Sequence, residues 1–180
     1  MGSMELTDIL SRLVIFIVVL LLSISIHEAG HAWMSYKFGD DTAKQLGRVT
    51  LNPIAHTDIL GTLILPIIGF ISASMGSVAL LGWGKPCPIE PRNWTNYKLA
   101  NVMVSLAGVL GNLILVVISF VIIKIMLNSG YWQSSDEGIM VPLKQLLSMM
   151  LLMNVSLMVF NLLPFPPLDG SKILGIFLPD

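Results

Sequence analysis

Long apolar runs restrict what this chain can fold into more than any other feature of its sequence. The runs cover residues 13–26, 59–81, 102–127 and 146–163. Segments of this kind, close to the length that crosses a lipid bilayer, are typical of transmembrane helices. Because 54% of the 180 residues are hydrophobic and only 12% are charged, the chain also lacks the charged helix faces of a soluble protein. We predict an all-α polytopic membrane protein with three or four transmembrane helices.

The charge balance and the cysteine count exclude several classes of function. The formal net charge is −1 and the pI is near 6.3, so there is no excess of basic residues to neutralise phosphates, and nucleic acid is not an expected partner. No nucleotide-binding motif is present. Cys87 is the single cysteine, which excludes an intrachain disulfide.

Both ends of the chain are expected to differ from those of the natural protein. Residues 1–3 precede a second methionine, Met4, and look like a remnant of cloning, so residues 4–180 are expected to form a single membrane-embedded core. The first apolar run has no small-residue cleavage pattern behind it and is expected to be a retained helix. The chain stops soon after a motif at Asp169, and we expect a natural C-terminal part to be missing.

The chemistry begins at the end of the first apolar run, with the pattern His27-Glu28-Ala29-Gly30-His31. Residues four apart lie on one face of a helix, so both imidazoles can reach one ion, which is the spacing of zinc sites of the HExxH type. Glu28 lies on the neighbouring face and is suited to accept a proton from water as a general base. Ionisable residues in an apolar helix cost roughly 2 kcal/mol or more and are usually functional.

A catalytic zinc takes three protein ligands, so a third must come from elsewhere in the chain. The candidates outside the motif are His56, Asp40, Asp41, Asp58 and Asp169. Asp169 is favoured because three prolines in 164–167 end the last apolar run just before it. Broken backbone at membrane depth is tolerated where it is buried in protein or lines a watery cavity.

The order of four motifs resembles the site-2 protease family of intramembrane zinc metalloproteases. The motifs are HEAGH at 27–31, GRVTLNP at 47–53, GWGKP at 82–86 and NLLPFPPLDG at 161–170. The resemblance implies one Zn²⁺ per chain held by His27, His31 and Asp169, with Glu28 as general base. It also implies that Asn161 helps to hold the substrate or its oxyanion; the less favoured alternative for an asparagine there is helix-to-helix hydrogen bonding.

The same resemblance reaches the third apolar run, where the family's Ala-Gly-Pro segment appears as Ala107-Gly108-Val109. The missing proline puts a helix kink in doubt there. Ala107, Gly108 and Gly111 are small residues whose spacing favours close helix packing. His56 is either a solvated loop histidine or a residue that handles substrate or water.

The run 59–81 is predicted to be a re-entrant or short β segment instead of a span. His27 and Asp169 can meet only if an even number of crossings separates them, and this run is the richest in glycine, proline and serine. The loops with Lys37, Lys44 and Arg48 and with Lys85, Arg92 and Lys98 then share one side, whereas 128–142 has neither Lys nor Arg. By the positive-inside rule the active site faces the cytoplasm.

We therefore expect a multi-pass membrane protease that hydrolyses peptide bonds in or near transmembrane segments of a membrane protein or peptide substrate. Its surroundings are the lipid bilayer. The alternative from another class is a non-catalytic transporter or scaffold whose intramembrane His and Glu serve protons or ions. A zinc metalloprotease of another membrane family, with a Glu or His as third ligand, is the alternative among enzymes.

Overall fold

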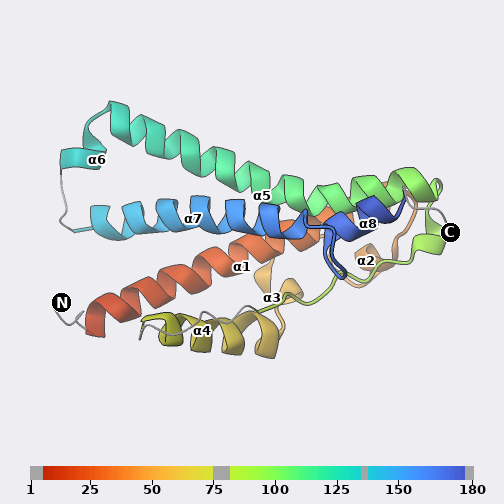
Figure 1. The fold of residues 1–180 in the computed structure, drawn as a ribbon, viewed down its shortest axis with the longest axis horizontal. Helices are drawn as coiled ribbons and strands as arrows, with labels where there is room; N and C mark the ends of the chain where they lie inside the picture. The colour runs from red at the N-terminus through yellow and green to blue at the C-terminus, as the bar shows by residue number, and fades with distance from the viewer. Residues whose placement is uncertain (1–5, 75–81, 135–137, 177–180) are drawn as a thin grey trace.

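Three long helices form the centre of the molecule (Figure 1). The computed structural model describes residues 6–74, 82–134 and 138–176. Helices α1 (Leu6–Lys37), α5 (Tyr97–Asn128) and α7 (Met140–Asn161) pack against one another and are each long and apolar enough to cross a membrane. The predicted all-α polytopic membrane fold is confirmed, with three such helices, and the described residues contain no β-strand.

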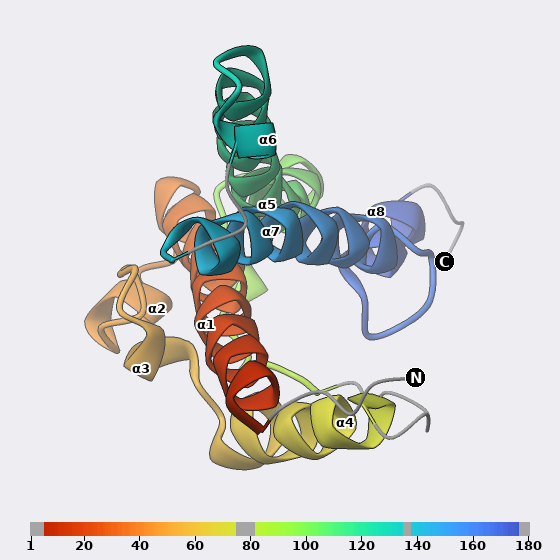
Figure 2. The same ribbon diagram turned by 90° about the vertical axis from the view of Figure 1, so that its left-hand side faces the viewer.

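Short elements connect and extend these helices. They are α2 (Thr42–Gln45), α3 (Pro53–His56), a π-helical turn η1 (Ile59–Ile64), α4 (Leu65–Ser74), a 3₁₀ turn η2 (Pro91–Asn93), α6 (Tyr131–Ser134) and α8 (Asp169–Gly175). Figures 1 and 2 both show α4 on the side of α1 that faces away from α5. The helix α5 begins where the Asn96 side chain accepts the Leu99 N–H at 3.1 Å, and it ends before Gly130, whose φ of 78° is left-handed.

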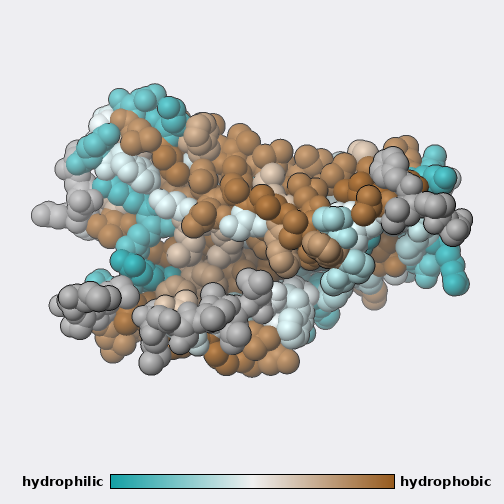
Figure 3. Space-filling view, in the orientation of Figure 1, coloured by the Kyte–Doolittle hydropathy of each residue, from teal (hydrophilic) through white to brown (hydrophobic). Residues whose placement is uncertain are grey.

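The buried positions between the long helices are small or polar, whereas the large apolar side chains face outward. Ser23, Asn112 and Asn154 have no exposed surface, but Ile114, on α5, is 54% exposed. Hydrophobic side chains cover the middle of the molecule and polar ones gather at its two ends (Figure 3). This distribution fits helices that contact lipid and pack against each other through small and hydrogen-bonded residues.

The run 59–81 is helical over residues 59–74, and residues 75–81 lie outside the described part of the chain. The Trp83 N–H donates to the Gly61 carbonyl at 3.0 Å, and the Thr62 hydroxyl donates to the Trp83 carbonyl at 2.8 Å. The start of the run therefore lies beside Trp83, which follows the run in the sequence. This arrangement supports a segment that returns to its starting side, which stays a prediction, and the described part of the run forms no β segment.

Candidate metal centre

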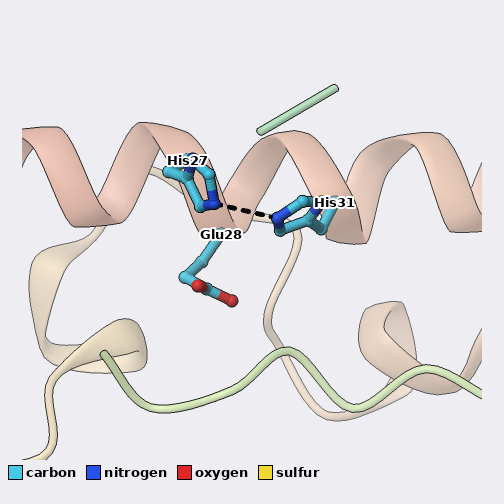
Figure 4. A group of neighbouring side chains, drawn as sticks. All are labelled: His27, Glu28 and His31. Carbon is cyan, nitrogen blue, oxygen red and sulfur yellow. Dashed lines mark hydrogen bonds between the residues drawn. The ribbon is translucent and has the colours of Figure 1, made fainter. Parts of the chain in front are cut away.

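Two histidines of α1 lie one turn apart on the face that meets α5. Their rings are close together, with 3.0 Å between the two Nε2 atoms (Figure 4). Both side chains are buried, and Gly108 of α5 makes room for them, since a Cβ at Gly108 would lie 2.6 Å from His31 Nε2 and 2.8 Å from His27 Cε1. A glycine at this crossing is thus required by the imidazoles as well as by helix packing.

Asp169 reaches the same point from the other end of the sequence. The proline-containing segment 162–168 follows α7, and Asp169 opens α8, which packs against α5. Its Oδ2 atom lies 3.3 Å from His27 Nε2 and 3.2 Å from His31 Nε2. The structure therefore brings together the three residues that the sequence analysis selected as metal ligands.

The distances among these three atoms match a metal centre. In a tetrahedral zinc site with bonds of about 2.0–2.1 Å, ligand atoms lie about 3.3–3.4 Å apart. The observed separations of 3.0, 3.2 and 3.3 Å are close to that value. Glu28 belongs to the same cluster, since it offers an oxygen within 4.8 Å of both histidine ligand atoms.

The hydrogen bonds on the far side of the rings show why a cation fits between them. His31 Nδ1 lies 2.7 Å from the Val104 carbonyl, which can only accept, so this nitrogen carries the proton. His27 Nδ1 lies 2.7 Å from Asn112 Oδ1 and is a donor for the same reason. In neutral imidazoles both Nε2 atoms then carry lone pairs, and they face Asp169 Oδ2, a buried oxygen without a hydrogen-bond donor. Three such acceptors at contact distance favour a bound cation.

The Glu28 side chain lies between α1 and the chain segment after residue 82 (Figure 4). Its Oε2 accepts the backbone N–H of Cys87 at 3.0 Å. Burial, followed by the nearby Glu28 carboxylate, raises the pKa of the Cys87 thiol to about 12. The thiol therefore stays protonated at neutral pH.

The other candidate residues lie elsewhere. His56 is buried and its Nε2 bonds to the Thr50 carbonyl at 2.8 Å. Asp40 is also buried, in a separate cluster where it accepts hydrogen bonds from Ser35, Thr42, Glu90 and Asn93. Asp41 accepts from Gln45, and Asp58 from Gly61.

Asn161 lies at the C-terminal end of α7. Its Nδ2 donates to the Leu157 carbonyl at 2.9 Å. This hydrogen bond of the Asn161 amide lies within α7 and does not join two helices. The residue is half-buried.

Sequence reasoning did not identify three further contacts at the centre. These are the amide of Asn112 on His27, the Cys87 N–H on Glu28, and Lys172 Nζ, which lies 3.0 Å from Asp169 Oδ1. A polar residue in an apolar run, as at Asn112, is the only signal that the sequence offered. The Cys87 contact uses a backbone N–H, so the residue type at position 87 does not predict it.

Comparison with known proteins identifies the family of the chain. The family model described as peptidase family M50 matches residues 134–179. The chain is 39% identical over 170 residues to a Bacillus subtilis (strain 168) protein named "Putative zinc metalloprotease YwhC", covering 94% of this chain and 72% of that protein. It is 31% identical over 170 residues to the Mycolicibacterium smegmatis protein of the same description named Rip2, covering 92% of this chain and 59% of the relative. No solved structure gives a significant match.

The chain thus spans about three fifths to three quarters of the length of these relatives. The aligned region of the Bacillus protein extends over nearly the whole chain, so it spans the positions of both the histidine pair and Asp169. Together with the family match over the C-terminal part and the convergence of His27, His31 and Asp169, this assigns the chain to a family. It belongs to the site-2 protease family of zinc metalloproteases, peptidase family M50.

Proposed function

We propose that this zinc metalloprotease cleaves peptide bonds in or beside transmembrane segments of membrane proteins. The observation that carries the proposal is the position of the centre, because His27 and His31 belong to a helix that is long and apolar enough to span a bilayer. A protease with its metal ligands on such a helix meets its substrates at or within the membrane. The family and the names of the relatives support proteolysis but do not identify the substrate.

His27, His31 and Asp169 are proposed as the zinc ligands and Glu28 as the general base. When bound, zinc supplies a Lewis acid that polarises the scissile carbonyl. The Glu28 carboxylate takes the proton of the attacking water and can return it to the leaving nitrogen. The Cys87 N–H, 3.0 Å from Glu28 Oε2, holds that carboxylate in place beside the ligands. Asn161 is proposed to hold the substrate or its oxyanion through its side-chain amide.

A substrate helix must be unwound locally, because its own hydrogen bonds shield its peptide groups. An apolar groove of about 460 Å³ lies between α1, α5 and residues 49–51. Its lining includes Trp33, Leu51 and Leu110. We propose that this groove receives apolar side chains of the loosened segment. Residues 46–48 offer no extended edge to its backbone, because their N–H groups donate within the turn that follows α2. The charge distribution of the loops supports a centre that faces the cytoplasm.

Glu28→Gln tests the catalytic assignment. The amide resembles the carboxylate in shape but cannot accept a proton, so zinc content should match that of the unmodified protein and cleavage of a transmembrane substrate should fall by 10²-fold or more. Asp41→Asn, an exposed carboxylate in a loop, is the matched control and should retain activity. Near-normal turnover in Glu28→Gln would remove Glu28 from the role of base.

A further inference from the structure

Three polar side chains with no exposed surface lie behind the metal centre, one on each long helix. They are Ser23 on α1, Asn112 on α5 and Asn154 on α7. Burying an amide in an apolar environment is costly unless its hydrogen bonds are made. Their position next to His27 and their complete burial suggest a task beyond holding helices together.

The hydrogen bonds of the two amides have only one consistent direction. Asn112 Nδ2 lies 3.2 Å from the Ser23 carbonyl and 2.8 Å from Asn154 Oδ1, so both of its hydrogens are donated. Asn154 Nδ2 in turn donates to Ser23 Oγ at 2.9 Å and to the Met150 carbonyl at 2.8 Å. Because the Ser23 and Met150 backbone carbonyls can only accept, neither amide can be turned over without losing a bond.

This direction determines which nitrogen of His27 carries its proton. With the NH₂ of Asn112 directed at Ser23 and Asn154, its Oδ1 is directed at His27 Nδ1, 2.7 Å away, and accepts a hydrogen bond from the Nδ1–H. The lone pair of His27 is then on Nε2, on the side of Asp169 and His31. A turned amide would place a donor against Nδ1 and leave the proton on Nε2, where it would block a metal ion.

We propose that Asn154 is a positioning residue that acts through Asn112 to hold His27 in its metal-binding tautomer and orientation. Asn154 and the segment leading to Asp169 belong to the same helix and its continuation, so the relay also fixes α7 relative to the histidines of α1. The inference rests on the proposed role of His27 as a ligand. It adds two residues on two other helices to the determinants of metal affinity.

Zinc affinity measured by competition with a chelator tests the relay without requiring a substrate. Asn112→Leu should weaken zinc binding 10–100-fold, which is the usual cost of losing a group that orients a metal-binding histidine. Asn154→Leu should weaken it by a smaller factor, because Asn112 can still accept from His27 but is no longer held in one orientation. Asn112→Asp keeps the acceptor and should bind zinc more tightly than Asn112→Leu.

The double variant Asn112→Leu/Asn154→Leu distinguishes a relay from two structural contributions. If Asn154 acts through Asn112, the double variant should lose no more affinity than Asn112→Leu alone, whereas independent effects would multiply. Ser119→Ala is the matched control, because this buried hydroxyl of α5 donates only to the Leu115 carbonyl of its own helix at 2.8 Å. The visible absorption of bound Co²⁺ should change in Asn154→Leu and stay unchanged in Ser119→Ala.

Each variant is compared in monodisperse detergent-solubilised form, and Asn154→Ala replaces Asn154→Leu if the latter is not recovered folded. Wild-type zinc affinity and an unchanged Co²⁺ spectrum in a folded Asn154 variant would overturn the relay, as would multiplying losses in the double variant. His27→Ala separates this failure from failure of the proposed function. If His27→Ala still binds zinc as tightly as the unmodified protein, the assignment of His27 itself is wrong.

Discussion

The two oxygens of the Asp169 carboxylate have different surroundings. Oδ2 faces His27 and His31 at 3.3 and 3.2 Å, whereas Oδ1 accepts from Lys172 Nζ at 3.0 Å. The lysine thus holds one oxygen and leaves the other for a metal. A ligating carboxylate that is itself hydrogen-bonded in this way is typical of metal sites, because the outer contact orients the ligand.

Asp169→Ala should therefore lose most bound zinc, since one of three ligands is removed. His56→Ala should retain it, because His56 is a buried histidine bonded to the Thr50 carbonyl and not part of the cluster. The zinc content per chain of each variant is measured after dialysis against a weak chelator. The unmodified protein is expected to hold about one equivalent. The reverse order of zinc loss would mean that the third ligand was assigned wrongly.

Asp40 gives a pH-dependent prediction away from the metal. Burial would raise the pKa of its carboxyl, but hydrogen bonds from Thr42, the Glu90 N–H, Ser35 and Asn93 lower it to about 2 from an ordinary value of 3.8. A pKa depressed by folding adds stability that is complete above the unfolded value and is lost as pH falls through the folded one.

The Asp40→Asn variant should accordingly be less stable than the unmodified protein at neutral pH. The difference should shrink as the pH falls from about 4 to about 2, because protonation removes the advantage of the carboxylate. Thermal unfolding in detergent at several pH values measures this, with Asp41→Asn as control. A difference in unfolding temperature that stays constant down to pH 2 would contradict the assigned role of the carboxylate.

At the scale of elements, the crossing of α1 and α5 depends on glycines. A Cβ at Gly111 would lie 2.9 Å from the Ile26 carbonyl oxygen, and a Cβ at Gly108 would lie 2.6 Å from His31 Nε2. The first contact is with backbone and the second with a proposed ligand. Gly111 thus allows the two helix backbones to approach each other, whereas Gly108 leaves space for the imidazole rings.

Gly111→Ala should lower the unfolding temperature while the folded protein keeps its zinc affinity, because only the helices must shift. Gly108→Ala should weaken zinc binding at least tenfold, since the new methyl group occupies space beside the ligand nitrogen. Gly175→Ala is the control, because nothing lies within 4 Å of a Cβ there. Equal zinc affinity in the Gly108 and Gly111 variants would show that the methyl group does not reach the imidazoles.

The elements differ in how well the sequence predicted them. The helices α1, α5 and α7 follow directly from apolar length, and the histidine pair follows from helical periodicity. Asp169 was selected as a ligand because three prolines follow α7 just before it. The partners Asn112 and Asn154 were not found, because which polar residues meet across three helices depends on rotation and crossing of the helices. The path of residues 82–90 over Glu28 depends on tertiary contacts that no local pattern encodes.

At the scale of the whole molecule, the side of the membrane on which each loop lies determines whether His27 and Asp169 are at the same level. Two crossings, α5 and α7, separate His27 from Asp169, so both ends of this pair lie at the same level if the run 59–81 does not span. The hydrogen bond between Trp83 and Gly61 favours that arrangement, because it joins the start of the run to the residues that follow it.

Labelling of single cysteines in intact cells by an impermeant thiol reagent tests this topology. In a Cys87→Ser background, Asp41→Cys and Arg92→Cys should be labelled only after permeabilisation, whereas Asp136→Cys should be labelled without it. Arg92 is suitable because its side chain is 93% exposed, so lack of labelling reports the side of the membrane and not burial.

Labelling of only one of positions 41 and 92 in intact cells would make the run 59–81 a true span. An odd number of crossings would then separate the histidines from Asp169, and the proline-containing segment would have to carry Asp169 back to mid-membrane depth to complete the metal centre. Opposite sides for positions 41 and 92 would also contradict the fold itself, in which the Glu90 N–H donates to the Asp40 carboxylate at 2.9 Å.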